Sequence, residues 1–135
     1  DHAINGAGHR LGTREIEEAG SAHPAIAEVA VVGVADQLKG QMPLAFAVVK
    51  DAARVATPEL RAALEKEVMA KVDSLLGAIG RPKRVYFITQ LPKTRSGKVL
   101  RRSIQAIAEG RDPGDLTTLD DPIGIQMVKE AVEGK

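Results

Sequence analysis

Residues 44–49 form an unbroken apolar run, Leu-Ala-Phe-Ala-Val-Val, and this run constrains the fold more than any other feature of the sequence. Side chains alternate between the two faces of a strand, so a strand that is apolar throughout has both faces buried. Residues 28–34 and 85–89 are rich in β-branched and aromatic side chains and predict two further strands. The sequence therefore predicts a small three-stranded sheet with residues 44–49 at its centre.

Two helices are predicted between these strands and ahead of them. Thr13 is the candidate N-cap of the first helix, which ends near residue 23 because Pro24 disfavours helical geometry in the residue before it. Thr-Pro-Glu at residues 57–59 starts the second helix, which ends at the glycines near residue 77. The apolar stripe of this second helix consists of Leu60, Leu64, Val68, Val72 and Leu75.

Two more helices are expected after the last strand. One turns Leu100, Ile104 and Ile107 inward, and the other follows Asp121-Pro122. Three glycines within residues 1–12 punctuate a short N-terminal hairpin. The predicted fold class is α+β, with an N-terminal hairpin and a small three-stranded sheet covered by helices.

Composition excludes several classes of protein. The 135 residues include no cysteine, so disulfides, thiolate metal sites and a cysteine nucleophile are excluded. The longest apolar runs fall far short of the ~20 residues that span a bilayer, so no membrane partner is expected. The chain begins with neither Met nor a basic leader, so we expect no signal peptide and interpret the chain as a piece of a longer, cytoplasmic protein.

The charges are unevenly distributed, although the net charge is only +1. Residues 74–108 contain no acidic residue and eight basic ones, which are Arg81, Lys83, Arg84, Lys93, Arg95, Lys98, Arg101 and Arg102. This basic segment predicts either a surface that meets phosphates or a solvated basic face. A nucleic-acid-binding module is a further alternative, opposed by the absence of tryptophan and by the place of Tyr86 and Phe87 in a predicted core strand. A free-standing interaction domain is opposed by the way the chain begins.

Two segments carry candidate chemistry. The first, P-K-T-R-S-G-K at residues 92–98, places three cations on a loop between a strand and a helix. It is not a Walker loop, because Pro92 and Val99 stand where that motif needs glycine and a hydroxyl residue. Its last lysine is a compact charge beside a glycine and can reach a phosphate or carboxylate oxygen. In the second segment, residues 7–18, Gly8 permits a close approach to the backbone and Arg10 offers a planar fork for phosphate.

Together these segments resemble the C-terminal domain of AMP-forming acyl-CoA synthetases, a superfamily that includes acyl- and aryl-CoA ligases, peptide-synthetase adenylation domains and luciferases. The resemblance covers nearly the whole chain. Strings similar to the acetyl/propionyl branch are G-H-R-L-G-T at 8–13, A-H-P-A-I-A-E-V-A-V-V-G at 22–33, K-G-Q at 39–41 and L-P-K-T-R-S-G-K at 91–98. Strings most similar to propionyl-CoA synthetases are D-H-A-I-N at 1–5, V-G-V-A-D-Q-L-K-G-Q at 32–41 and R-V-Y-F at 84–87.

The resemblance implies two half-reactions performed with two orientations of this domain. Lys98 matches the catalytic lysine that bridges the carboxylate and the α-phosphate of ATP during adenylation. Asp1 matches the hinge about which the domain turns. Ala7 and Gly8 match the lining of the tunnel for the pantetheine arm of CoA, and Arg10 matches an arginine that contacts the nucleotide phosphate.

Two more sites are implied with departures from the family pattern. His23, with the backbone carbonyls of Ser21 and Ile26, falls where some relatives bind a structural magnesium, and the alternative is a His-Pro turn whose ring is satisfied by the protein. Asp73 falls where acetyl-CoA synthetases carry an arginine for the CoA phosphate, and an acid cannot do that work. The candidates to replace that arginine are Arg81, Lys83 and Arg84.

The resemblance also implies the organisation and the partners. All 135 residues form one lid domain of a larger ligase, with residues 1–12 as hinge and CoA-tunnel loop, 13–110 as the α+β core and 111–135 as a loop and C-terminal helix. The implied partner is the N-terminal domain of the same ligase, which would hold the acyl pocket and most of the ATP site. The fragment alone is expected to need no cofactor and to have no activity.

The implied substrates are ATP with Mg²⁺, CoA and a short-chain carboxylate. Propionate is the expected acid, with acetate or another short-chain acid as the alternative. Lys98 further matches the lysine that protein acetyltransferases modify in this branch and that a deacetylase would restore. Arg95, Arg101 and Arg102 are candidates for steering such an acidic partner.

Overall fold

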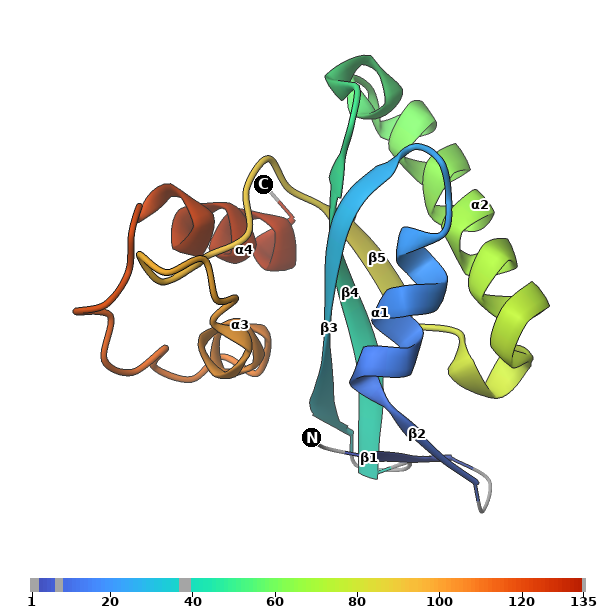
Figure 1. Ribbon diagram of the computed structural model, residues 1–135, viewed down its shortest axis with the longest axis horizontal. Coiled ribbons are helices and arrows are strands. Elements are labelled where there is room, and N and C mark those ends of the chain that lie inside the picture. The colour runs from blue at the N-terminus through green and yellow to red at the C-terminus, as the bar shows by residue number, and fades with distance from the viewer. Residues whose placement is uncertain (1–2, 7–8, 37–39, 135) are drawn as a thin grey trace.

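A three-stranded sheet between two helical layers organises the computed structural model, which describes residues 3–6, 9–36 and 40–134 (Figure 1). The strands are β3 (Ile26–Asp36), β4 (Gly40–Val49) and β5 (Arg84–Phe87), in the order β3-β4-β5. β3 and β4 are antiparallel, whereas β4 and β5 are parallel. The central position predicted for residues 44–49 is confirmed.

Helices α1 (Thr13–Ser21) and α2 (Pro58–Leu76) cover one face of this sheet. Ile16 of α1 and the buried part of the α2 stripe pack against alternate residues of the strands, such as Val31 and Ala45. The prediction that Leu60 and Leu75 also face the core is wrong, because these side chains are 44% and 55% exposed. They lie near the two ends of a 19-residue helix, and only its middle covers the sheet.

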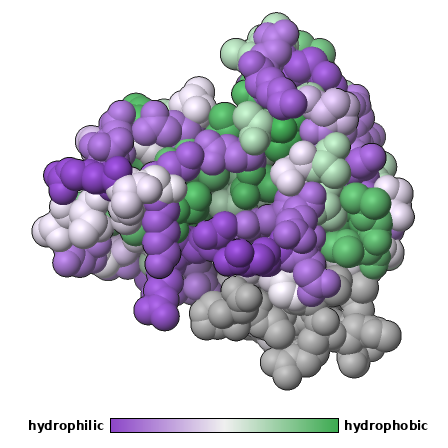
Figure 2. All heavy atoms as spheres, viewed as in Figure 1, coloured by the Kyte–Doolittle hydropathy of each residue, from purple (hydrophilic) through white to green (hydrophobic). Residues whose placement is uncertain are grey.

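Helices α3 (Arg101–Ala108) and α4 (Ile123–Glu133) cover the other face. Ile104 of α3 and Val128 of α4 are completely buried against Phe46 and its neighbours on β4. The face seen in Figure 2 is mostly hydrophilic over the α3–α4 layer, and hydrophobic residues are visible in the middle of the view and at its right edge. Two short 3-10 helices, Ala52–Val55 and Ala78–Gly80, flank α2.

The N-terminal strands β1 (Ala3–Gly6) and β2 (His9–Gly12) pair as an antiparallel hairpin that leads directly into α1. The N-cap of α1 is Gly12 rather than the predicted Thr13, and the Gly12 N–H donates to the Glu15 carboxylate at 3.3 Å. The start of α2 follows the prediction, because the Thr57 hydroxyl accepts from the Leu60 N–H at 3.1 Å. None of the helices in the described part of the chain is long and apolar enough to cross a membrane.

Candidate functional site

Residues 92–98, hereafter the lysine loop, lie between β5 and α3. They form a tight turn that is closed by hydrogen bonds of the backbone. The Thr94 N–H donates to the Lys98 carbonyl at 2.8 Å, and the Lys98 N–H returns to the Thr94 hydroxyl at 3.1 Å. Gly97 has a φ of 90° and donates to the Thr94 carbonyl at 2.9 Å. Glycine adopts this backbone geometry without strain, so its place beside Lys98 has a conformational reason.

Lys98 is exposed at the end of this turn. Its ammonium group has no hydrogen bond or ion pair with any residue that the structure describes. The backbone on which it stands is nevertheless fixed, since the Leu100 N–H donates to the Pro92 carbonyl at 3.0 Å across the base of the loop. Lys98 thus combines an uncommitted charge with a defined point of attachment.

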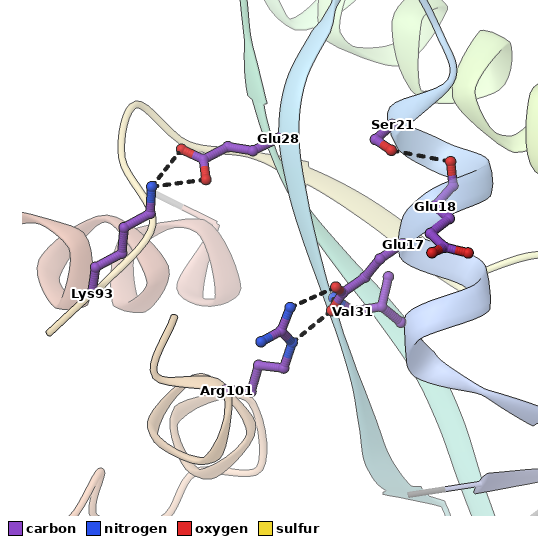
Figure 3. Close-up of polar contacts among 7 residues, drawn as sticks. All are labelled: Glu17, Glu18, Ser21, Glu28, Val31, Lys93 and Arg101. Atoms are coloured by element: carbon purple, nitrogen blue, oxygen red, sulfur yellow. Dashed lines mark hydrogen bonds and ion pairs between the residues drawn. The ribbon is translucent and has the colours of Figure 1, made fainter. Parts of the chain in front are cut away.

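Two ion pairs attach the flanks of the lysine loop to the rest of the domain (Figure 3). The Lys93 ammonium lies 2.9 Å and 3.1 Å from the two carboxylate oxygens of Glu28 on β3. Arg101 donates from Nε and Nη2 to the two carboxylate oxygens of Glu17 on α1, at 2.7 Å and 2.6 Å. The hydrogen bonds to Glu17 raise the pKa of Arg101.

The segment that follows α3 returns across the lysine loop and pairs with it. The Asp120 N–H donates to the Lys93 carbonyl at 2.9 Å, and the Arg95 N–H donates to the Thr118 carbonyl at 3.3 Å. The Arg95 side chain also reaches the Thr117 carbonyl at 3.4 Å. The lysine loop is therefore held by residues 117–120 as well as by the ion pairs to β3 and α1.

Much of the basic segment is neutralised inside the domain. Arg81 pairs with Asp73 at 3.0 Å, and Arg84 pairs with Glu65 at 2.9 Å, which raises the pKa of Arg84. Lys83 is exposed and its ammonium has no ion pair among the described residues. Of the three candidates for the CoA phosphate, Lys83 is the one whose charge is not already committed to a carboxylate.

The aromatic residues of the sheet are buried or half-buried. The Tyr86 ring stacks on Phe46 with centroids 5.2 Å apart, and Phe46 is fully buried. The Arg84 guanidinium lies 5.0 Å from the Tyr86 ring centroid. These contacts disfavour the nucleic-acid alternative, because base stacking needs an accessible aromatic face.

His23 uses both ring nitrogens within the protein. The Ala25 N–H donates to Nδ1 at 3.0 Å, so Nε2 carries the proton and donates to Glu67 at 2.9 Å. The bond from His23 is the main cause that lowers the pKa of Glu67. The Ser21 hydroxyl donates to the Glu18 carbonyl at 3.0 Å (Figure 3), and in the part of the chain that the structure describes no three His, Asp or Glu residues could hold a metal ion. These contacts fit the satisfied His-Pro turn.

Of the other predicted site residues, the structure describes only Arg10. Arg10 lies on β2 opposite Asn5, while Asp1, Ala7 and Gly8 lie outside the described residues. The hairpin lies at one end of the sheet and the lysine loop belongs to the α3–α4 layer, so the structure does not bring these two sites together. A groove of about 510 Å³ between α2, β5 and α4 is a separate feature, and Lys98 does not line it.

Comparison with known proteins gives a consistent set of matches. Residues 15–98 match the family described as the AMP-binding enzyme C-terminal domain. The chain is 59% identical over 133 residues to a propionate–CoA ligase of Escherichia coli strain K12 and 48% identical over 133 residues to an acetyl-coenzyme A synthetase of Pyrobaculum arsenaticum. Each alignment covers 98% of this chain, but it covers only 21% and 19% of those proteins. The chain thus spans about a fifth of the length of these relatives.

A crystal structure of an acyl-CoA synthetase from Brucella canis superposes on 73% of this chain and 17% of that chain, with a TM-score of 0.63 and 36% identity. The α+β fold expected from the sequence is thereby confirmed. The matched family segment ends at Lys98, whereas the contacts that hold the lysine loop also come from residues beyond it.

Proposed function

The chain belongs to the AMP-binding enzyme C-terminal domain family, and from this premise we propose that it is the mobile C-terminal domain of a short-chain acyl-CoA ligase that activates propionate. The propionate–CoA ligase of Escherichia coli at 59% identity supports this acid over acetate, whose synthetase in Pyrobaculum arsenaticum is 48% identical. The observation that carries the proposal is an exposed lysine without a partner among the described residues, on a loop fixed at both flanks.

In the proposed first half-reaction, a carboxylate oxygen attacks the α-phosphorus of ATP and pyrophosphate leaves with the electron pair of the broken bond. Two anions must approach each other, and negative charge is redistributed on the phosphoryl oxygens. Lys98 would place its ammonium group between the carboxylate and the α-phosphate, where a preorganised cation stabilises the transition state. The fixed backbone of the lysine loop lowers the cost of holding that cation in place.

In the proposed second half-reaction, the CoA thiolate attacks the acyl carbon and AMP leaves. Lys98 would withdraw when the domain rotates about the hinge at Asp1, and the glycine-containing segment with Ala7 and Gly8 would replace it. The separation of the hairpin from the lysine loop supports this division, because one orientation could present only one of them to a single active site. Arg10 would contact the nucleotide phosphate, and Lys83 would serve the CoA phosphate.

Acetylation of Lys98 would abolish its charge and thus the first half-reaction. An exposed lysine without an internal partner among the described residues is accessible to a protein acetyltransferase. Arg102 remains available to steer an acidic protein, since it is exposed, whereas Arg101 is bound to Glu17.

The experiment is a carboxylate panel with the full-length protein that carries this chain. Pyrophosphate release is measured with acetate, propionate and butyrate, with and without CoA. The proposal expects release that depends on the carboxylate, with the highest kcat/KM for propionate. Higher kcat/KM for acetate would overturn the substrate assignment, and the absence of carboxylate-dependent release would overturn the activity itself.

A further inference from the structure

The carboxylate of Glu17 occupies the outer edge of the sheet. β3 is an edge strand, so the N–H groups on its outer side have no strand partner. The Val31 N–H donates to Glu17 at 2.8 Å, and Arg101 adds its two bonds to the same carboxylate. Glu17 is only 8% exposed, and all three donors point at it (Figure 3).

This ion pair joins the two helical layers around the edge of the sheet. Glu17 belongs to α1, which directly follows the hairpin, and Arg101 begins α3, three residues after Lys98. The two helices lie on opposite faces of β3 in Figure 1. The Glu17–Arg101 pair is therefore a direct side-chain link between the helix that carries the hairpin and the helix that carries the lysine loop.

The geometry of the pair fixes orientation as well as distance. Two parallel N–H···O bonds align the plane of the guanidinium with the carboxylate, which a single ammonium contact cannot do. The Lys93–Glu28 pair on the other flank lacks this fork, because one ammonium nitrogen contacts both carboxylate oxygens. The Arg101 side is thus the flank that sets the direction in which the loop leaves the layer.

We propose that Glu17 and Arg101 are positioning residues for Lys98, and that they hold the lysine loop at the angle to the sheet that adenylation needs. The inference rests on the proposed function of Lys98. Neither residue touches a substrate in this scheme. Their effect on the reaction passes through the first turn of α3 to the lysine, where a displacement of about 1 Å can cost roughly 100-fold in rate.

Glu109 provides a matched control at the other end of α3. Its carboxylate also accepts an N–H from the edge of β3, from Ala35 at 2.7 Å, and also binds an arginine, Arg111. The side chain of Glu109 is 15% exposed, and the side chain of Glu17, taken alone, is 10% exposed. Glu17→Gln and Glu109→Gln therefore each alter a carboxylate that binds an N–H of β3 and an arginine. The contact of Glu17 is with Arg101 at the start of α3, three residues after Lys98, whereas the contact of Glu109 with Arg111 lies beyond the end of α3.

The experiment compares four variants of the full-length protein, Glu17→Gln, Arg101→Lys, Glu109→Gln and Lys98→Ala. Each half-reaction is measured separately, as pyrophosphate release and as thioester formation from supplied propionyl-adenylate. Glu17→Gln is expected to lower kcat for pyrophosphate release by roughly 10- to 100-fold with KM for ATP little changed, and to retain thioester formation. Glu109→Gln is expected to retain both half-reactions. Arg101→Lys keeps the charge but loses the parallel bonds, so its kcat for pyrophosphate release should also fall.

The outcomes separate this inference from the proposed function. Equal losses in Glu17→Gln and Glu109→Gln, or equal losses in both half-reactions of Glu17→Gln, would overturn the positioning role and leave a structural one. If Glu17→Gln does not fold, Arg101→Lys is compared with Glu109→Gln in the same two half-reactions. Pyrophosphate release at the wild-type rate by Arg101→Lys would also overturn the inference. Should Lys98→Ala itself release pyrophosphate normally, the proposed function fails first.

Discussion

Gly124 of α4 lies directly against the backbone of Pro92 at the start of the lysine loop. A Cβ on Gly124 would come within 2.6 Å of the Pro92 nitrogen and 2.7 Å of its Cα. Only a residue without a side chain allows this approach, because backbone atoms cannot move aside as the end of a flexible side chain can. The C-terminal helix therefore supports the loop that carries Lys98 by direct contact between two main chains.

Gly124→Ala is expected to force α4 and the lysine loop apart. The overpacked contact should lower the free energy of unfolding by about 1–3 kcal/mol, as measured by urea denaturation of the isolated domain. In the full-length protein, kcat for pyrophosphate release should fall more than the rate of thioester formation, because the displaced segment carries Lys98. Unchanged stability and activity would contradict this reading of the contact.

Gly20→Ala is expected to have the opposite effect on stability. A Cβ at Gly20 would meet Val29, Val68 and Val72 at 3.7–4.0 Å, which is ordinary van der Waals contact. Alanine is favoured over glycine inside a helix by about 1 kcal/mol, so the substitution should raise the urea midpoint. A lower midpoint would mean that α1 cannot accept a methyl group where it crosses α2.

Thr94→Val tests the internal bond of the lysine loop. Valine keeps the shape of the side chain but removes the hydroxyl that accepts from the Lys98 N–H at 3.1 Å. Amide hydrogen exchange at Lys98 should become faster, while the free energy of unfolding changes by only about 1 kcal/mol. Thr117→Val is a suitable control, because the Thr117 side chain lies outside this turn. If the Lys98 amide exchanged equally fast in Thr117→Val, the faster exchange could not be attributed to the Thr94 hydroxyl.

The His23–Glu67 bond predicts a pH effect of defined sign. The bond from His23, with a smaller contribution from Arg54, holds the pKa of Glu67 below its usual value. A carboxylate whose pKa is lowered on folding stabilises the folded state above its unfolded pKa, and this stabilisation is lost as the pH falls through the folded pKa. A carboxyl NMR titration should show the low pKa, and His23→Ala should raise it more than Arg54→Ala. A Glu67 pKa unaffected by His23→Ala would refute the pairing.

The sheet and the helices could be predicted from the sequence because each depends on a local pattern. The apolar run of β4, the Thr57-Pro58 start of α2 and the glycine that ends α2 each act within a few residues. The exposed ends of the α2 stripe could not be predicted, since the 3.6-residue period tells which side of a helix is apolar but not how far the covered sheet extends.

Lys98 could be selected as a candidate from its motif, but the residues that hold its loop could not be predicted. Glu17 and Glu28 are distant from the lysine loop in sequence, and each resembles an ordinary surface acid. The packing of α1 brings Glu17 to Arg101, and β3 brings Glu28 to Lys93. Likewise the basic segment suggested an open cationic surface, because the sequence does not show that Asp73 and Glu65 return to Arg81 and Arg84. Pairing between distant charges is a property of the packed layers.

The most direct test of the central claim is the rate of pyrophosphate release by Lys98→Ala in the full-length protein, with propionate and ATP as substrates. Lys129→Ala, which removes an exposed lysine from α4, is the control. We predict that Lys98→Ala loses pyrophosphate release by several orders of magnitude while it still forms propionyl-CoA from supplied propionyl-adenylate, and that Lys129→Ala retains both. Normal pyrophosphate release by a folded Lys98→Ala protein would contradict the role assigned to this lysine.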